Sequence, residues 1–140
     1  MTQEEKELLL KDLCARLPYG VIIKHKDEHG RSIGARLVGY NGDWFNYYID
    51  DLCFHLKIYE FKPYLRPMSS MTDEEKHKLL KFGAITCLEN GEVIDVSCVG
   101  FERHADVQNY LNTCHFDYRG LIEKGLALEA PEGMYNVNEE

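Results

Sequence analysis

Six consecutive residues near the C-terminal end carry the side chains of an acid, a base and a nucleophile: Cys114-His115-Phe116-Asp117-Tyr118-Arg119. Cysteine catalysis needs an accessible thiolate that is paired with a base, and adjacent residues of a helix point about 100° apart. Cys114 and His115 are therefore poorly placed to serve each other. We expect Asp117 to cap a helix end and Arg119 to form an ion pair, so no catalytic residue is predicted. An enzyme that uses this Cys/His/Asp cluster is kept as an alternative.

Metal and phosphate sites have weaker signals. Cys53 with His55, and Cys114 with His115, supply four possible zinc ligands, and the first two share a face if they lie on a strand. Zinc sites usually contain two closely spaced ligand pairs such as Cys-x-x-Cys, which this chain lacks. It also lacks the glycine-rich phosphate loops G-x-G-x-x-G and G-x-x-x-x-G-K. The sequence predicts no metal and no cofactor.

Two segments could bind a partner molecule. Tyr64-Leu65-Arg66-Pro67-Met68 combines a ring, a guanidinium and an apolar end between prolines, features that are common at protein interfaces. With the turn at 117–125 it gives our predicted binding residues: Tyr64, Arg66, His115, Asp117, Tyr118 and Arg119. The alternative is that the first segment only connects two parts of the fold.

Aromatic and basic residues in the middle of the chain suggest a second kind of binding surface. Rings and positive charge on one sheet could stack on and neutralise a nucleotide or another small molecule. The residues concerned are Arg36, Trp44, Tyr47, Tyr48 and Lys57. We keep a small-molecule or nucleotide binder as an alternative to a protein-binding module. The other possibility is that the rings are core and the charges are solvated.

Helical elements are indicated by capping boxes. Thr2 with Glu5 begins a helix over residues 3–16, and Thr72 with Glu75 begins a second over 73–82, closed by Gly83. A third pattern turns helical from Phe101 onward. These three helices must hold the candidate residues in place.

Strands are indicated by alternation and by two Asn-Gly turns. Asn41-Gly42, as a two-residue turn, would place Tyr40 opposite Asp43 and Val38 opposite Phe45. Asn90-Gly91 would pair Cys87 with Ile94, Ile85 with Val96 and Thr86 with Asp95, giving one apolar and one polar face. Residues 19–66 then form a small antiparallel sheet or an SH3-like barrel, and the predicted fold class is α+β.

The 140 residues suit a single domain, which we place at 1–130, followed by a partly disordered acidic tail at 131–140. The five cysteines are odd in number and widely spread, which favours reduced thiols in a cytoplasm, buried as small hydrophobic residues. No apolar run has the length of a membrane span, so we expect neither membrane insertion nor secretion.

Charge narrows the class of partner. The net charge of -8 argues against a protein that binds nucleic acid by neutralising phosphates. The excess lies outside residues 18–66, which hold seven Lys and Arg against six Asp and Glu. We therefore expect a protein partner in preference to a nucleic acid.

Three blocks of sequence carry a resemblance: LLLKDLCARLPYGV at 8–21, KPYLRPMSSMT at 62–72 and HFDYRGLIEKGLALEAPEGMY at 115–135. They resemble an uncharacterised family of small proteins from gut-bacterial phages and prophages. The resemblance implies a bacterial host cytoplasm and a small accessory protein that acts by binding something of the host or the phage. It implies no reaction, ligand or catalytic residue. Where that family often has a second histidine before His115, this chain has Cys114.

Overall fold

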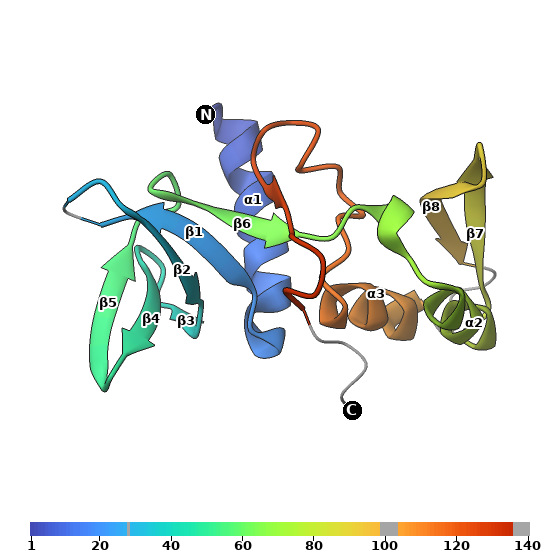
Figure 1. Ribbon diagram of the computed structural model, residues 1–140, viewed down its shortest axis with the longest axis horizontal. Helices are drawn as coiled ribbons and strands as arrows, with labels where there is room; N and C mark the ends of the chain where they lie inside the picture. The colour runs from blue at the N-terminus through green and yellow to red at the C-terminus, as the bar shows by residue number, and fades with distance from the viewer. Residues whose placement is uncertain (28, 99–103, 136–140) are drawn as a thin grey trace. The chain divides into compact units, whose positions relative to one another are not determined.

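The computed structural model describes residues 1–27, 29–98 and 104–135, and its ribbon is drawn in Figure 1. Over these residues the chain forms three α-helices and nine short β-strands, which confirms the α+β class. No helix among them has both the length and the apolar character that a membrane crossing requires.

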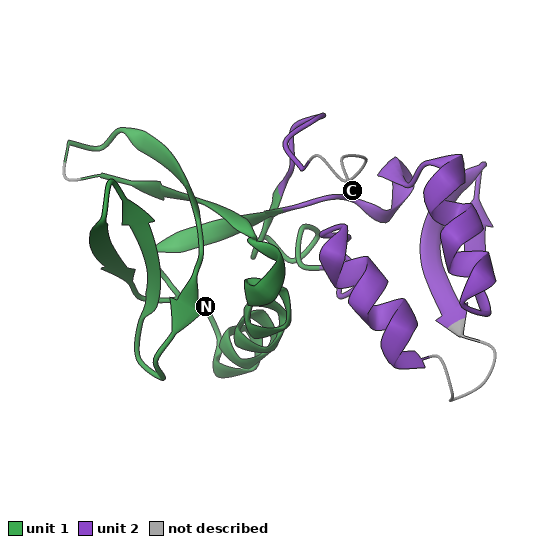
Figure 2. Cartoon of the chain, turned by 90° about the horizontal axis from the view of Figure 1, so that it is seen from below, with its two compact units in different colours: residues 1–64, 121–128 green, residues 65–120, 129–140 purple. Residues whose placement is uncertain are grey.

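The chain divides into two compact units, each built from separate stretches of sequence (Figure 2). Unit 1 comprises residues 1–64 and 121–128, and unit 2 comprises residues 65–120 and 129–140. Of the three boundaries, those after Tyr64 and Leu128 fall inside strands, and the third follows Gly120.

Unit 1 begins with a helix and continues with short strands. Its elements are α1 (Gln3–Arg16), a 3-10 turn η1 (Leu17–Tyr19), β1 (Ile22–Lys26), β2 (Ser32–Arg36), β3 (Gly39–Tyr40), β4 (Phe45–Ile49), β5 (Leu52–Leu56) and most of β6 (Phe61–Leu65).

Helix α1 has the predicted limits because both bonds of the capping box form. Thr2 Oγ1 accepts from the Glu5 N–H at 3.1 Å, and Glu5 Oε1 accepts from the Thr2 N–H at 2.9 Å. The buried face also contains charge: Arg16 donates two hydrogen bonds to Asp12, and neither side chain is exposed to solvent. The interior of unit 1 therefore contains an ion pair, which apolar periodicity does not predict.

Two sheets share the strands of unit 1. The first has the order β2-β1-β6-β9, where β9 is Leu128–Glu129, and the second has the order β3-β4-β5. The chain passes from one to the other at Leu37 and Val38, whose N–H groups donate to Val21 O and Asn46 O respectively. The described strands close no barrel, so of the two predicted alternatives the structure has open sheets and no SH3-like barrel.

The register predicted at Asn41-Gly42 is wrong. The loop contains four residues, because the Asn41 side chain accepts from the N–H groups of both Asp43 and Trp44. Tyr40 consequently lies opposite Phe45. The two-residue turn of this sheet is Asp50-Asp51, where both residues have positive φ, 48° and 68°.

Unit 2 consists of helices around a two-stranded sheet. Its elements are a 3-10 turn η2 (Met68–Ser70), α2 (Asp73–Lys81), β7 (Ala84–Glu89), β8 (Glu92–Cys98) and α3 (His104–Thr113). The predicted start of the third helix at Phe101 lies outside the described residues. One apolar cluster joins all these elements: Met68, Met71, Leu79, Ala84, Val93, Val107, Leu111, Cys114 and Phe116.

The second hairpin is predicted correctly at its turn and incorrectly beyond it. Asn90 and Gly91 have φ of 53° and 82°, as a type I′ turn requires. A β-bulge then gives β8 one extra residue, Ile94, so that Cys87 pairs with Asp95 instead of Ile94. The pairs Ile85–Val96 and Thr86–Asp95 are also wrong, and the structure has Ile85–Ser97 and Thr86–Val96.

Residues 131–135 of the predicted tail lie within the described part of the chain. Ala130 N–H donates to Leu65 O at 2.8 Å, and Met134 N–H donates to Pro131 O. Tyr135 is buried, and its ring stacks on His115. The rest of the predicted tail, residues 136–140, lies outside the described residues.

Candidate functional site

The two predicted binding segments meet within unit 2 through their backbones. Arg66 N–H donates to His115 O at 2.8 Å, and Asp117 N–H donates to Arg66 O at 2.8 Å. Arg66 and Phe116 thus form a short parallel bridge, and the guanidinium lies 4.3 Å from the centre of the Phe116 ring. The residues predicted to bind a partner therefore do come together, but they bind each other and form a structural junction.

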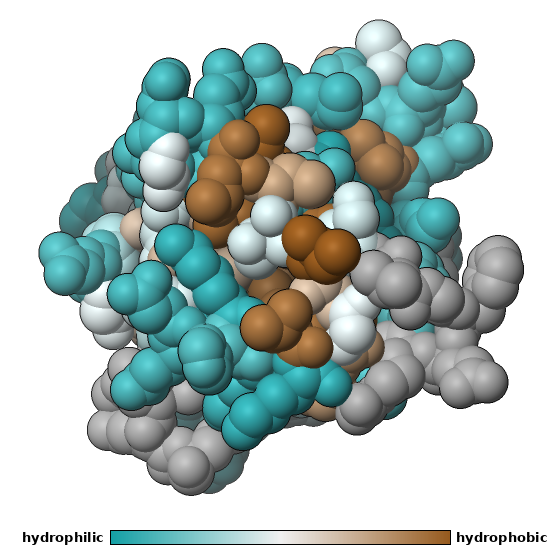
Figure 3. All heavy atoms as spheres, turned by 90° about the vertical axis from the view of Figure 1, so that its right-hand side faces the viewer, coloured by the Kyte–Doolittle hydropathy of each residue, from teal (hydrophilic) through white to brown (hydrophobic). Residues whose placement is uncertain are grey.

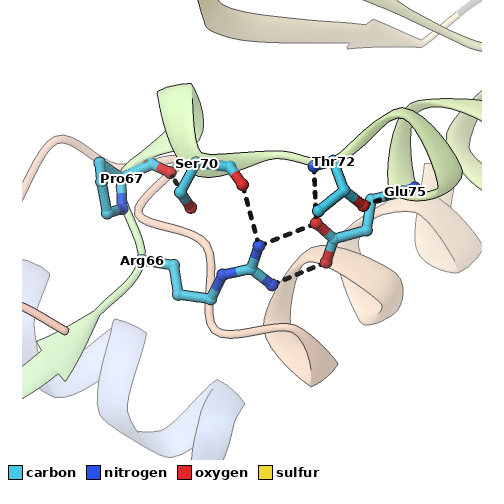
Figure 4. A network of polar contacts seen from close by, with 5 residues as sticks. All are labelled: Arg66, Pro67, Ser70, Thr72 and Glu75. Atoms are coloured by element: carbon cyan, nitrogen blue, oxygen red, sulfur yellow. Dashed lines mark hydrogen bonds and ion pairs between the residues drawn. The ribbon is translucent and has the colours of Figure 1, made fainter. Parts of the chain in front are cut away.

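Both terminal nitrogens of the Arg66 side chain are hydrogen-bonded at this junction (Figure 4). Its Nη1 and Nη2 donate to the two carboxylate oxygens of Glu75 at 2.6 and 2.8 Å, and Nη2 also donates to Ser70 O at 3.2 Å. The side chains of Arg66 and Glu75 are 13% and 4% exposed. The contact holds the proline-bracketed segment against the start of α2.

Glu75 serves two purposes at once. Its Oε1 accepts from Arg66 and from the Thr72 N–H, so the capping box predicted at Thr72 also positions the carboxylate for the guanidinium. Burial acts to raise the pKa of this carboxyl, but the hydrogen bonds from Arg66 and Thr72 outweigh it and hold the pKa below its usual value. Glu75 is charged at neutral pH.

The other predicted binding residues are also packed into the molecule. His115 is buried with a φ of 60°, and its ring lies 3.9 Å from that of Tyr135. Tyr118 donates to Asn112 Oδ1, and the Arg119 guanidinium covers the Tyr118 ring at 4.6 Å. Asp117 is buried as well, and Tyr64, the last residue of this stretch of unit 1, is half-buried.

The Cys114 thiol is unsuited to nucleophilic chemistry. It lies in the core of unit 2 at 3% exposure, and burial raises its pKa to about 11. At neutral pH it is protonated and out of reach of a substrate. The geometry thus disfavours the Cys/His/Asp enzyme considered from the sequence.

Three of the five residues considered for stacking lie in β4 or directly beside β4 and β5, on the solvent-facing side. Lys57 Nζ lies 4.4 Å from the centre of the Trp44 ring. Tyr48, in β4, is 54% exposed. The remaining two lie elsewhere. Tyr47 points inward and stacks on Phe54, and Arg36 donates to Gly20 O.

A thiol and an imidazole lie together on this same side. Cys53 Sγ is 3.8 Å from His55 Nε2, so the prediction that the two share a face of a strand is correct. Both are exposed, which contradicts the expectation that the cysteines are buried, as does the exposed Cys14. No group of three or more His, Cys, Asp or Glu suited to a metal occurs among the described residues.

Sequence reasoning missed an apolar surface on unit 2. Ile85, Leu88 and Ile94 of the β7–β8 hairpin are 53%, 57% and 55% exposed, and Leu80 of α2 is 62% exposed. Figure 3 views this end and shows apolar side chains gathered among hydrophilic ones. The expected division into one apolar and one polar face fails because the bulge lets Val93 and Val96, three residues apart, both face the apolar cluster, while Ile94 between them is exposed.

Unit 2 is also strongly acidic. Its residues include six Lys and Arg against thirteen Asp and Glu, whereas unit 1 has ten against eleven. Within the hairpin the charged residues are all acidic: Glu89, Glu92 and Asp95. Apolar and acidic side chains thus share this surface.

No family model, curated protein or solved structure matches the chain.

Proposed function

We propose that this chain acts by binding a protein partner through the outer side of the β7–β8 hairpin. The observation that carries the proposal is the exposure of Ile85 and Ile94, 53% and 55%, on the side of the hairpin that faces away from the buried Val93. Large contiguous apolar patches are rare on monomeric proteins and often mark sites of interaction.

The architecture gives a reason for such a partner. A two-stranded sheet is marginal by itself, and this one gains its support from one side, where Ala84 and Val93 join the apolar cluster of unit 2. A partner that covers the other side would remove the exposed parts of Ile85 and Ile94 from water. By area this contributes roughly 1 kcal/mol for each isoleucine.

Charge defines the kind of partner. Glu89 and Glu92 lie directly opposite each other across the turn, and like charges in that position destabilise a hairpin. Lysine or arginine on a partner would relieve this repulsion and attract it during encounter. A second copy of the chain would bring the same acidic excess, so the favoured partner has apolar residues flanked by basic ones.

This surface replaces the one expected from the sequence. Arg66 is held by Glu75, and His115 is covered by Tyr135, so neither is presented to a partner. The class of function, a binding protein, is the one expected from the residues. The surface that carries it is different.

The test is affinity capture from a bacterial lysate with quantitative mass spectrometry, comparing wild type with a double variant, Ile85→Thr with Ile94→Thr. Threonine retains β-branching and strand propensity while removing apolar area. The matched control is Leu52→Thr, which changes a 65% exposed leucine on β5 in unit 1. The proposal expects a protein that the control retains, that the double variant loses, and whose capture weakens with salt. Equal capture by wild type and the double variant would refute the choice of surface.

A further inference from the structure

The solvent-facing side of β5 contains a thiol beside an imidazole. Cys53 and His55 are two residues apart, so they point to the same side of the strand. Their Sγ and Nε2 atoms are 3.8 Å apart, within hydrogen-bonding reach for sulfur, and both side chains are exposed. This pair belongs to unit 1 and is independent of the proposed protein-binding surface.

The neighbouring strand supplies further donors to the same sulfur. Asn46 lies opposite His55, and its Nδ2 donates to Cys53 Sγ at 3.8 Å. Tyr48 lies opposite Cys53, and its hydrogen bond to that thiol raises the pKa of the Tyr48 phenol, which is therefore protonated at neutral pH. Polar groups of β4 thus surround the Cys53 sulfur on the side next to His55.

A glycine on the third strand makes this arrangement possible. Gly39 lies opposite Asn46, and a Cβ at position 39 would be only 2.8 Å from Asn46 Oδ1. The Asn46 amide occupies the space that a larger residue would need. The absence of a side chain at Gly39 thus leaves the amide nitrogen of Asn46 free to point toward Cys53.

We propose that Cys53 is a nucleophilic thiol, with His55 as its base, that exchanges with small anionic disulfides. His55 Nε2 accepts the Sγ proton, and the thiolate attacks one sulfur of the disulfide. The S–Sγ bond forms as the original S–S bond breaks, and the departing thiolate takes the proton back from His55. One thiol and one disulfide become one mixed disulfide and one thiol, so no other oxidant is required.

Two features favour a disulfide over other electrophiles. Exchange needs only an accessible thiolate, and the exposed face of β5 provides access. Lys57 is two residues beyond His55, on the same side, and places a positive charge next to the Trp44 ring. A carboxylate-bearing disulfide such as glutathione disulfide fits this combination.

The chain contains its own comparison thiols. Cys14 is also exposed, but partial burial raises its pKa, which lowers its thiolate fraction at neutral pH. Cys87 is half-buried, and its contact is the hydroxyl of Ser97 at 3.8 Å, which is no base at neutral pH. Cys114 is buried, with its pKa raised to about 11. Cys53 should therefore react first among these four.

The test treats the reduced, full-length protein with glutathione disulfide near neutral pH and follows each cysteine by peptide mass spectrometry. Cys53 is expected to react at least about tenfold faster than Cys14, and His55→Gln should lower the Cys53 rate about tenfold while leaving Cys14 unchanged. The matched control His77→Gln, an exposed histidine of α2, should change neither rate.

A pH series separates a base from a merely structural histidine. Between about pH 8 and about pH 6 the Cys53 rate of the wild type should fall less than that of Cys14, and His55→Gln should make the two fall together. The ionisable groups on this side of the sheet are Tyr48, Cys53, His55 and Lys57. If Cys53 reacts no faster than Cys14, or if His55→Gln leaves its rate and pH dependence unchanged, the proposal is overturned.

Discussion

Replacing Glu75 with glutamine tests whether the ion pair with Arg66 stabilises unit 2. The carboxylate accepts hydrogen bonds from Arg66 Nη1, Arg66 Nη2 and the Thr72 N–H at 2.6, 2.8 and 2.9 Å. Glutamine has nearly the same shape but has one acceptor oxygen and no charge. It removes the attraction to Arg66 and turns one of the three bonds into a contact between two donors.

The magnitude follows from the burial of both partners. Removing one member of a buried ion pair costs about 3–5 kcal/mol, because the remaining charge is left uncompensated. Here the Arg66 side chain is 13% exposed and also donates to Ser70 O, which offsets part of that cost. We therefore expect Glu75→Gln to lower the free energy of unfolding by about 2–3 kcal/mol.

The matched control is Asp73→Asn in the same first turn of α2. Asp73 is fully exposed, and its contact with Lys76 is 3.6 Å long. Exposed pairs of this kind contribute little to stability. Its effect should be much smaller than that of Glu75→Gln.

The pH dependence provides a second readout. The pKa of Glu75 is lower in the folded protein than its ordinary value of 4.5, so its contribution to stability is complete above that value. The contribution is lost as the pH falls through the folded pKa. The difference between wild type and Glu75→Gln should be full at neutral pH and should shrink below about pH 4.

Urea unfolding followed by far-UV circular dichroism measures these differences in the free energy of unfolding. The single tryptophan, Trp44, belongs to unit 1, so its fluorescence reports on that unit and the dichroism on both. A loss for Glu75→Gln no larger than that for Asp73→Asn would refute the reasoning. A difference that stayed constant into acid would refute it as well.

Two further predictions concern the interior of unit 1 and the hairpin of unit 2. Asp12→Asn should cost about 3–5 kcal/mol in urea unfolding monitored by Trp44 fluorescence, because the Arg16 charge is fully buried beside it; Asp27→Asn, whose partner Arg31 is 75% exposed, should cost far less. Gly91→Ala should cost about 1–2 kcal/mol by far-UV circular dichroism because its φ is 82°, whereas Gly34→Ala, in extended backbone and with only Ile23 O near its Cβ, should be neutral or stabilising.

Local chemistry predicted the parts of the fold that depend on few residues. Both capping boxes form because each needs only a hydroxyl and a carboxylate three residues apart. The turn at Asn90-Gly91 forms because both residues tolerate positive φ. Asn41-Gly42 has the same letters, but there the Asn41 side chain satisfies two backbone N–H groups and produces a longer loop.

The predictions that were wrong or incomplete concern features that depend on packing between distant segments. The extra residue in β8 has no local signal, yet it decides that Val96 faces the same side of the hairpin as Val93. The two segments around Arg66 and His115 were correctly selected as special, but only the folded chain shows that they pair with each other. The cysteines were misjudged because exposure is a property of their place in the fold: Cys14 and Cys53 are exposed, and Cys114 is buried.

The division of the chain into interleaved stretches has a consequence for how it is made. The chain crosses from one unit to the other three times, after Tyr64, Gly120 and Leu128. Leu121, Leu126 and Ala127 are buried residues of unit 1, so that unit lacks part of its interior until residue 128 has been synthesised. Unit 2 in turn contains the buried Tyr135, whose ring stacks on His115. Folding one unit completely before the other emerges from the ribosome, the usual order for successive domains, is therefore unavailable to this protein.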